Sequence, residues 1–434
     1  MKFYNREKEL EKLRGIEHSS LSGSKMTVVV GRRRIGKTKL IKEAFEQKVY
    51  FFVSKKNEAL LCEEFINVLQ NTLAIKILGS FTKFKDLFET MMILTKERAI
   101  TLIIDEFQEF LQINPSIYSD MQNIWDEYKD ATKMNLILSG SIYSLMKKIF
   151  EDKKEPLFGR ADAKIHLQPF RVNTLKEILE DYNATYTKED LLSFYIFTGG
   201  VAKYVELFVN AGALSKEKQL DLIFNEDSLF LEEGKNLLIE EFGKEYTTYF
   251  SILSLIASSK TSRSAIESIL ERNIGGYLDR LENEYTVIRK IKPVFAKEGS
   301  RTQKYKISDN FFNFWFRFIY KNKSAIEIGN YEYVRTIVER DFSVYSGKFL
   351  EKYFIEKLKI SQNYSIIGTY WERNNDNEID IVALNEMEKS MLIVEVKLNP
   401  KKIDLEVLKN KSVKLIEGFK SYRIDYKGYS IEDM

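Results

Sequence analysis

With 434 residues, the chain is too long for one ordinary hydrophobic core, and a composition of 44% hydrophobic and 30% charged residues is typical of a globular protein with two to four domains. The single cysteine, Cys62, excludes an internal disulfide and a cysteine-based metal site, and the two histidines, His18 and His166, are far apart in the sequence. A formal net charge of +3 permits nucleic-acid binding without requiring it. Because no apolar run reaches the length of a membrane span and the first residues have no apolar signal core, we expect a cytoplasmic protein without a membrane partner.

The N-terminal segment, residues 3–16, reads F-x-x-R-E-x-E-L followed by apolar residues at helical spacing. It predicts an amphipathic helix. The next stretch, residues 26–40, reads MTVVVGRRRIGKTKL and contains the phosphate-loop motif G-x-x-x-x-G-K-[ST] between a β-branched strand and a helix. The motif predicts a nucleotide site made of Gly31, Arg32, Arg33, Arg34, Ile35, Gly36, Lys37, Thr38 and Lys39.

Each residue type in this loop has a chemical reason. Gly31 allows the turn out of the strand, and Gly36 lets backbone N–H groups approach an anion. Lys37 reaches the β and γ phosphates and is a catalytic residue in this interpretation, while the Thr38 hydroxyl is a ligand for Mg²⁺. The side chains of the arginine run, residues 32–34, are expected to face solvent or a neighbouring domain.

Three further strands are expected in this part of the chain. Residues 49–53 read as a short buried strand, followed by helices over 60–73 and 84–95, and residues 99–104 form an apolar strand that ends in Asp105 and Glu106. Asp105 would hold Mg²⁺, and Glu106 would polarise the attacking water. The strand over 135–141 ends in small polar residues, of which Ser139, and Ser141 second, could sense the γ phosphate; a plain helix N-cap at Ser141 is the alternative. Alternating strands and helices predict a parallel sheet.

Arg160, in the segment Pro156–Arg160, is the best candidate for a positive charge at the nucleotide phosphates, acting within the chain or across a subunit interface; a structural loop arginine is the alternative. Residues 174–242 read as a helical lid. Three short helices and two paired strands over 246–307 fit a winged helix-turn-helix. A DNA-binding role for this segment would depend on its basic residues, which are Arg272, Arg280, Arg289, Lys290, Arg301 and Lys304. The acidic residues Asp279, Glu282 and Glu284 lie on or beside the expected recognition helix and would repel phosphate, and the alternative is a domain-packing module.

The C-terminal part contains a second group of chemistry-bearing residues. The aromatic stretch 311–318 is expected to be core. Residues 378–384 and 391–397 are apolar segments that predict a hairpin, in which Asp380 and Glu395 lie side by side and Lys397 projects from the same strand face as Glu395. The two carboxylates could bind a divalent metal ion, with Lys397 as a catalytic partner and Glu351 from an upstream helix as a third ligand. The alternative is a pair of strands with salt bridges.

Taken together, these motifs resemble the archaeal-type ATPases of the AAA/STAND division, in the order F-x-x-R-E-x-E-L, GRRRIGKT, LIIDEF, LILSGS, PLFGR, TGGVAKY, FFNFWFRF and IDIVAL…IVEVK. The resemblance implies an α/β fold with a P-loop NTPase parallel sheet, residues 1–170; a helical lid, 171–242; a winged helix-turn-helix, 243–308; and a C-terminal α/β domain like the PD-(D/E)xK restriction endonucleases, 309–434. It also implies that Arg6 packs near the adenine. Two positions depart from the family pattern, where Ala202 and Ile379 replace prolines.

We therefore expect an enzyme that binds and hydrolyses ATP with Mg²⁺ and couples nucleotide state to a DNA-acting, metal-dependent, nuclease-like domain. The catalytic residues in this interpretation are Lys37, Glu106, Arg160, Asp380, Glu395 and Lys397, and the metal ligands are Thr38, Asp105, Glu351, Asp380 and Glu395. The expected partners are ATP, DNA, and a second copy or another protein. The alternative is a signalling ATPase whose C-terminal domain is a non-catalytic binding module, and a third class is a scaffold that binds nucleotide without turnover.

Overall fold

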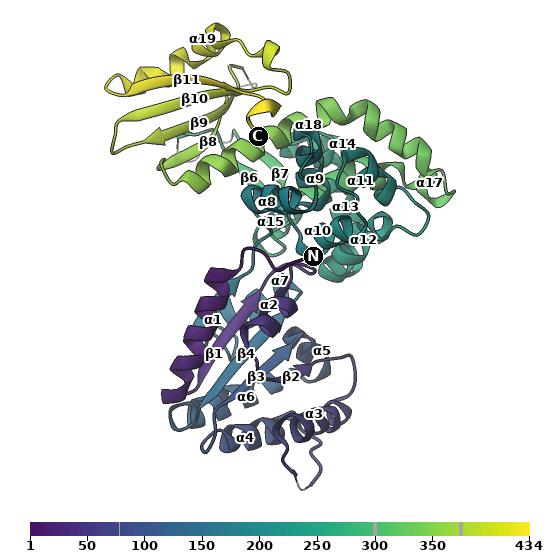
Figure 1. Ribbon diagram of the computed structural model, residues 1–434, viewed down its shortest axis with the longest axis vertical. Helices are drawn as coiled ribbons and strands as arrows, with labels where there is room; N and C mark the ends of the chain where they lie inside the picture. The colour runs from purple at the N-terminus through teal and green to yellow at the C-terminus, as the bar shows by residue number, and fades with distance from the viewer. Residues whose placement is uncertain (78, 298–301, 373–375) are drawn as a thin grey trace. The chain divides into compact units, whose positions relative to one another are not determined.

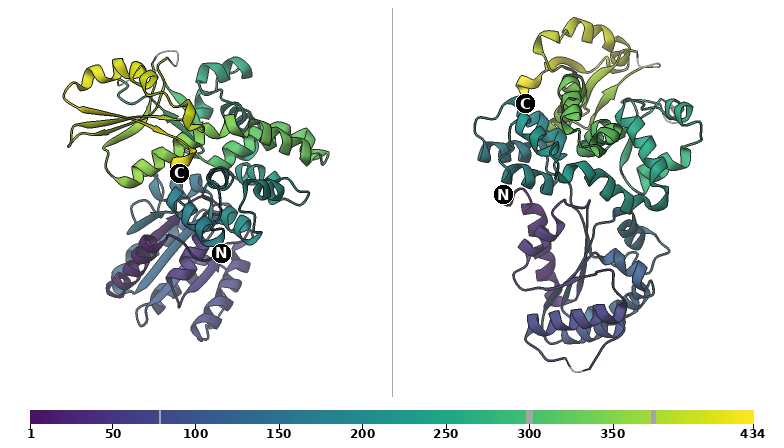
Figure 2. Two further views of the ribbon diagram at one scale, coloured as in Figure 1. Left: turned by 45° about the horizontal axis from the view of Figure 1, so that its top comes forward. Right: turned by 90° about the vertical axis from the view of Figure 1, so that its right-hand side faces the viewer.

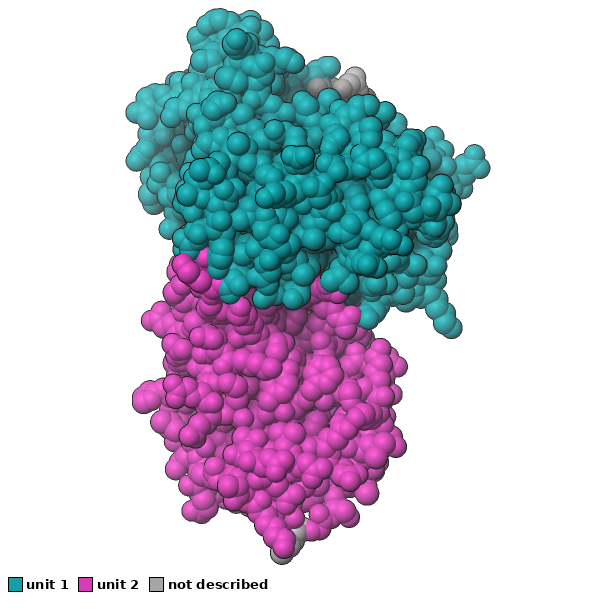
Figure 3. Space-filling model, turned by 45° about the vertical axis from the view of Figure 1, so that its right-hand side comes forward, with its two compact units in different colours: residues 1, 170–434 teal, residues 2–169 magenta. Residues whose placement is uncertain are grey.

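The structure is a computed structural model that describes residues 1–77, 79–297, 302–372 and 376–434 (Figure 1). These residues form two compact units, one of residues 2–169 and the other of residue 1 with residues 170–434. Figure 3 colours the two units separately. The first unit contains the phosphate loop, and the second contains the C-terminal carboxylates.

In the first unit, helices alternate with strands. The elements are α1 (Glu7–Ser19), β1 (Lys25–Val30), α2 (Lys37–Ala44), β2 (Val49–Phe52), α3 (Glu58–Leu73), α4 (Phe84–Leu94), β3 (Ile100–Asp105), α5 (Phe110–Ile113), α6 (Ile117–Tyr128), β4 (Met134–Gly140), α7 (Tyr143–Glu151) and β5 (Ala163–His166). The five strands form one parallel sheet in the order β2-β3-β4-β1-β5. This sheet confirms the predicted α/β fold with a parallel sheet.

Both faces of this sheet are buried, which explains why its strands read as continuous apolar runs. Alternate residues such as Val28, Leu102 and Leu136 belong to one core with apolar residues of α3, α4, α6 and α7. The residues between them, such as Val29 and Ile103, point to the opposite face, where α1 and α2 pack together. The right-hand view of Figure 2 shows helices on both sides of the sheet.

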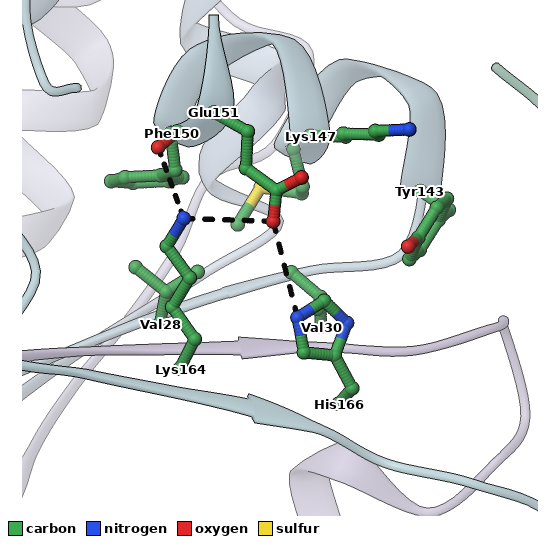
Figure 4. A pocket seen from close by; sticks show the side chains of 9 residues that line it. Val28, Val30, Tyr143, Lys147, Phe150, Glu151, Lys164 and His166 are labelled. Atoms are coloured by element: carbon green, nitrogen blue, oxygen red, sulfur yellow. Dashed lines mark hydrogen bonds and ion pairs between the residues drawn. The ribbon is translucent and has the colours of Figure 1, made fainter. Parts of the chain in front are cut away.

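The edge strand β5 is held to α7 by polar contacts. Lys164 Nζ donates to the carbonyl oxygen of Phe150 at 3.2 Å and lies 3.5 Å from Glu151 Oε1, and His166 Nε2 lies 4.0 Å from the same carboxylate oxygen (Figure 4). These side chains line a cavity of about 10 Å³ beside Val28 and Val30. That volume holds no more than about one water molecule, so the contacts are structural.

The second unit begins with helices. They are α8 (Val172–Tyr182), α9 (Lys188–Thr198), α10 (Ala202–Asn210), α11 (Lys216–Ile223), α12 (Leu229–Phe242), α13 (Tyr246–Ala257), α14 (Arg263–Leu270) and α15 (Gly275–Asn283). An antiparallel pair follows, β6 (Ile288–Ile291) and β7 (Lys304–Ile307). Three helices followed by a two-stranded hairpin are the elements that the sequence predicted for 246–307.

The aromatic stretch forms core, as predicted. It spans α16 (Asn310–Phe314) and a π-helical turn, Trp315–Ile319, and all of its phenylalanines and its tryptophan are buried. Trp315 Nε1 donates to the carbonyl oxygen of Leu231 at 2.9 Å, which satisfies the buried indole N–H. A nucleic-acid stacking surface is thereby excluded for these side chains.

The C-terminal elements are α17 (Lys323–Glu327), α18 (Tyr331–Ser361), β8 (Ile366–Tyr370), β9 (Ile379–Asn385), β10 (Ser390–Val396), α19 (Leu405–Ile416) and β11 (Arg423–Tyr429). The four strands form a sheet in the order β11-β10-β9-β8, with β8, β9 and β10 antiparallel and β11 parallel to β10. The predicted hairpin is therefore confirmed as β9 and β10. Val382, Leu384, Met391 and Ile393 share one core with Leu408 of α19.

Candidate nucleotide and metal sites

The phosphate loop leaves β1 and enters α2 with the glycines where the backbone needs them. Gly36 caps α2 with a φ of 97°, a left-handed conformation that favours glycine. A Cβ on Gly31 would lie 2.8 Å from the carbonyl oxygen of Leu167, so a side chain there would force the loop to shift. Lys37 is buried, and its Nζ donates to the carbonyl oxygens of Gly31 at 2.8 Å and Arg32 at 3.2 Å. The lysine is therefore held over the loop that it would serve.

Thr38 and Asp105 meet at the carboxyl end of the sheet. The Thr38 hydroxyl donates to Asp105 Oδ2 at 3.0 Å, and the backbone N–H of Glu106 donates to Asp105 Oδ1 at 3.0 Å. A hydroxyl and a carboxylate are oxygen donors of the kind that Mg²⁺ prefers, so this pair fits the ion that the motif implies.

Tyr50 of β2 is a residue of this site that the sequence analysis missed. Its hydroxyl donates to Asp105 Oδ2 at 2.6 Å. Burial, together with this contact to Asp105, raises the pKa of Tyr50 well above its usual value, so it remains a neutral donor. The available signal was a lone hydroxyl in the otherwise apolar strand VYFFV, next to β3 in the sheet.

Glu106 is fixed by two short hydrogen bonds. Its Oε2 accepts from Gln108 Nε2 and from Ser141 Oγ, both at 2.6 Å, and its backbone has a φ of 56°, which is uncommon for a residue with a side chain. Gly140 makes room for this arrangement, because a Cβ there would lie 2.4 Å from Gln108 Oε1. Of the two serines predicted as γ-phosphate sensors, Ser141 contacts Glu106, whereas the buried Ser139 Oγ has no hydrogen-bond partner among the described residues.

The remaining predicted nucleotide residues lie at different places. Arg6 is buried and donates to the carbonyl oxygen of Gln168 at 2.8 Å. Ile35 is buried, while Arg33 and Lys39 are exposed.

Within the described ranges, no contact joins Arg160 to Thr38 or Asp105. Its Nη2 lies 2.7 Å from Asp126 Oδ2 in α6, and its Nη1 donates to the carbonyl oxygens of Pro156 at 2.6 Å and Phe158 at 3.3 Å. The geometry of the arginine is therefore that of a loop anchor.

In the second unit, Asp380, Glu395 and Lys397 converge. The pairing of Ile381 with Val394 places Asp380 opposite Glu395 at the end of the β9–β10 ladder. Lys397 Nζ lies 3.5 Å from Asp380 Oδ2 and 3.2 Å from Glu395 Oε1, so the ammonium group bridges the two carboxylates. Burial alone would lower the pKa of Lys397, but the two carboxylates raise it.

Backbone donors and a second lysine complete this site. The N–H of Val396 donates to Asp380 Oδ2 at 2.7 Å, and the N–H of Asp404 donates to Glu395 Oε2 at 3.0 Å. Lys411 of α19 lies 3.8 Å from Glu395 Oε1. Lys411 was missed because only the packing of α19 on the sheet brings it there, and a lysine in the middle of an amphipathic helix carries no local signal.

Glu351 of α18 lies near this pair without completing a metal site. Burial, and then the charge of Asp380, raises the pKa of Glu351 to about 7, and burial also raises the pKa of Asp380. Among the described residues, no group of three or more His, Cys, Asp or Glu side chains lies together as a metal-binding set. The structure thus brings together the predicted pair, Asp380 and Glu395, but not a set of three with Glu351.

Most of the basic residues expected to contact DNA have partners inside the second unit. Arg280 pairs with Glu245 at 2.9 Å, Lys290 with Glu282 at 3.0 Å, and Lys304 with Glu378 at 2.9 Å. Arg272 Nη1 donates to the Thr248 hydroxyl at 3.1 Å. Arg301 lies outside the described residues, which leaves Arg289 as the remaining member of the set.

The parallel sheet, the phosphate loop and the Asp105–Glu106 strand end define a P-loop ATPase. A family model described as an ATPase domain predominantly from Archaea matches residues 3–208, and a model for archaeal and bacterial proteins of unknown function matches residues 315–414. An uncharacterized protein of Methanocaldococcus jannaschii is 30% identical over 406 residues, which cover 91% of this chain and 87% of that protein. The chain belongs to this family of archaeal-type ATPases.

Solved structures resemble the chain at low sequence identity. The Walker-type ATPase PABY2304 of Pyrococcus abyssi has a TM-score of 0.54 at 18% identity, and the match covers 73% of this chain and 96% of that one. The ORC2 protein of Aeropyrum pernix, solved in ADPNP and ADP complexes, has a TM-score of 0.48 at 16% identity, covering 75% and 96%. The first of these supports the fold. None of the described helices has the length and apolar character needed to span a lipid bilayer.

Proposed function

We propose that this ATPase uses its nucleotide cycle to control a divalent-metal-dependent hydrolysis of phosphodiester bonds, with DNA as substrate, by its C-terminal region, residues 309–434. The observation that supports this proposal is the position of the Lys397 ammonium between Asp380 and Glu395, at 3.5 and 3.2 Å. Two carboxylates and a lysine on adjoining strands combine the ligands of a hard cation with a donor for a phosphate oxygen.

The residues at the ATP site have separate roles in this proposal. Lys37 contacts the β and γ phosphates, and Thr38 and Asp105 hold Mg²⁺. Glu106 accepts a proton from the attacking water at its carboxylate, which Ser141 and Gln108 keep in place. Tyr50 orients Asp105 through its hydrogen bond to Oδ2.

At the second site, Asp380 and Glu395 would hold a divalent cation, which supplies a water of lowered pKa and neutralises phosphate charge. The N–H groups of Val396 and Asp404 fix the two carboxylates, each through one oxygen. Lys397 donates to a non-bridging phosphate oxygen. Lys411, from α19, adds positive charge on the side of Glu395.

The proposal is tested with the purified full-length chain, on double-stranded DNA, single-stranded DNA and RNA, with Mg²⁺ or Mn²⁺, and with or without ATP. We expect DNA cleavage that Asp380→Asn and Lys397→Met each lower by at least about 100-fold, as the loss of about 3 kcal/mol of transition-state stabilisation would give. ATP hydrolysis should continue in both variants. Lys409→Met is the matched control, because Lys409 is an exposed lysine of α19 that pairs with Glu406 at 2.6 Å.

Two results would separate the parts of the proposal. Cleavage of none of the substrates under any of these conditions would overturn the nuclease assignment. Cleavage that is insensitive to ATP, and to the Lys37→Ala variant that removes ATP binding, would overturn the coupling and leave the nuclease in place.

One observation favours the second candidate function, a signalling ATPase with a non-catalytic C-terminal module. Lys397 and Lys411 balance the charges of Asp380 and Glu395, so the four side chains also fit a structural salt-bridge network that needs no metal ion. Calorimetric titration with Mn²⁺ distinguishes the two functions. Binding that Asp380→Asn abolishes supports the metal site, and no binding supports the module.

A further inference from the structure

A basic cavity in the second unit was given no role in the function proposed above, although Glu351, which lies near Asp380, is part of its wall. It has a volume of about 570 Å³, and its walls come from the β6–β7 pair, α16, α18 and β8. That volume lies within the range of about 300–1,000 Å³ that is usual for small-molecule sites. No residue of the phosphate loop lines it, so it is separate from the ATP site.

The charge of the cavity is strongly positive. Of the described residues, seven lysines and one arginine line it, against a single carboxylate, Glu351. Lys290 and Lys304 are paired with Glu282 and Glu378. The other six have no ion-pair partner in the part of the chain that the structure describes, and they are Arg289, Lys292, Lys306, Lys348, Lys352 and Lys359.

Two of these cations, Lys348 and Lys352, are held by neutral groups instead of counter-ions. Lys348 Nζ donates to Asn313 Oδ1 at 2.9 Å, and Lys352 Nζ donates to the carbonyl oxygen of Ser308 at 2.8 Å. Burial, and then the charge of Lys306, lowers the pKa of Lys348 to about 7. Cations that repel one another in a partly buried space destabilise the fold unless an anion offsets them, and such arrangements concentrate at functional sites.

Apolar and aromatic side chains form the rest of the wall. Tyr305 and Phe349 are both buried and line the cavity together with isoleucines such as Ile256 and Ile367. A site for an inorganic ion alone has no use for such a surface, whereas an organic phosphate would contact it with its apolar part.

We propose that this cavity binds a small polyphosphorylated organic ligand, an anion of nucleotide size that carries two or more phosphate groups. The phosphates lie among Arg289, Lys306 and Lys348, and the organic part lies against Tyr305 and Phe349. A phosphate oxygen accepts hydrogen bonds from lysine and arginine as a charge-assisted pair, which is stronger than a neutral hydrogen bond.

The test uses the full chain with Lys37→Ala, which removes phosphate binding at the loop. Calorimetric titrations with inorganic tripolyphosphate and with a nucleoside triphosphate follow the binding. We expect both to bind, the nucleotide more tightly, and the added double change Lys306→Gln with Lys348→Gln to weaken binding by at least about 10-fold, since each lysine contributes a charged hydrogen bond. The matched control is Lys323→Gln, an exposed lysine of α17 that pairs with Glu327 at 3.0 Å, and it should change the affinity by less than about 2-fold.

Three results would overturn the proposal. The first is no binding of either probe to the Lys37→Ala chain, and the second is unchanged binding in the double variant. The third is tighter binding of a single-stranded oligonucleotide of about 12 nucleotides than of the triphosphate, through the same two lysines. That result would make the cavity part of a nucleic-acid binding surface. Two controls distinguish lost binding from lost folding. One is Lys348→Met, which keeps the length of the side chain without its charge, and the other is a thermal midpoint measured for every variant.

Discussion

Replacement of Ser141 by alanine tests how the ATP site holds Glu106. The Ser141 hydroxyl and the Gln108 amide both donate to Glu106 Oε2 at 2.6 Å, and both donors are buried. Ser141→Ala removes one of these two bonds and leaves the other. We therefore expect Glu106 to rotate away from the direction in which it meets water, with a lower rate of ATP hydrolysis.

The size of the effect follows from the type of bond. A hydrogen bond to a charged group contributes about 1.5–3 kcal/mol, which corresponds to about 10- to 150-fold in rate. Glu106 is only half-buried and keeps its bond to Gln108, so the lower end, about 10-fold in kcat, is expected. The KM for ATP should stay within about 2-fold, because no contact joins Ser141 to the phosphate loop in the described residues.

Steady-state release of phosphate measures this change. Ser22→Ala is the control, because Ser22 is an exposed serine of the same unit whose hydroxyl donates to the carbonyl oxygen of Ser19 at 3.0 Å, so its loss should leave kcat unchanged. Ser141→Thr, which keeps the hydroxyl, should restore most of the rate. A Ser141→Ala enzyme with the kcat of the wild type, or one that is faster, would refute the positioning role of this serine.

Two further predictions concern the second unit. Gly234→Ala would place a Cβ 2.3 Å from the Trp315 ring, so it should lower the free energy of unfolding by about 1–3 kcal/mol. Gly276→Ala, in a helix with open space around it, should raise the free energy of unfolding by about 0.5–1 kcal/mol. Thermal midpoints compare the two variants. Burial lowers the pKa of Lys348 from its usual 10.5 to about 7 in the folded protein. Between pH 7 and 10.5 the unfolded chain therefore binds more protons than the folded chain. The contribution of this lysine to stability accordingly rises as the pH increases above 7. The stability of Lys348→Met relative to the wild type should therefore be greatest at pH 7 and fall towards pH 9, and a constant difference would contradict the buried charge.

The sequence predicted best those features that local chemistry determines. The loop Gly31–Thr38 follows from the φ of Gly36 and the close approach at Gly31, and the hairpin register that places Asp380 opposite Glu395 follows from the alternation of its strands. The strands β5, β8 and β11 were not predicted. β5 is a four-residue edge strand, and β11 carries charged residues at alternate exposed positions, so neither has the apolar run that marks a buried strand.

Contacts between distant segments were beyond the reach of sequence patterns. The sequence indicated only a helix around Glu351, whereas α18 has 31 residues. Its buried side chains lie on different faces along its length, because it meets first the helical part and then the C-terminal sheet. Tyr50, Gln108 and Lys411 entered the sites by the same kind of packing. None of them belongs to a motif, and each is identified only by the carboxylate that it touches.

The two sites satisfy a lysine in a similar way, although Lys37 is buried and the Lys397 side chain is 35% exposed. Lys37 is satisfied by carbonyl oxygens of its own loop, and Lys397 is satisfied by the carboxylates beside it. Buried charges require such partners, because an unpaired one costs several kcal/mol. A phosphate at the loop, or a cation at Asp380 and Glu395, must then displace bonds that these groups already make within the protein. The net affinity of each site is therefore the strength of the bonds to the ligand minus the strength of the bonds that the ligand displaces. The Arg32 carbonyl, which accepts from Lys37, and Lys411, which pairs with Glu395, belong to the displaced bonds, so changes at these residues should alter the affinity.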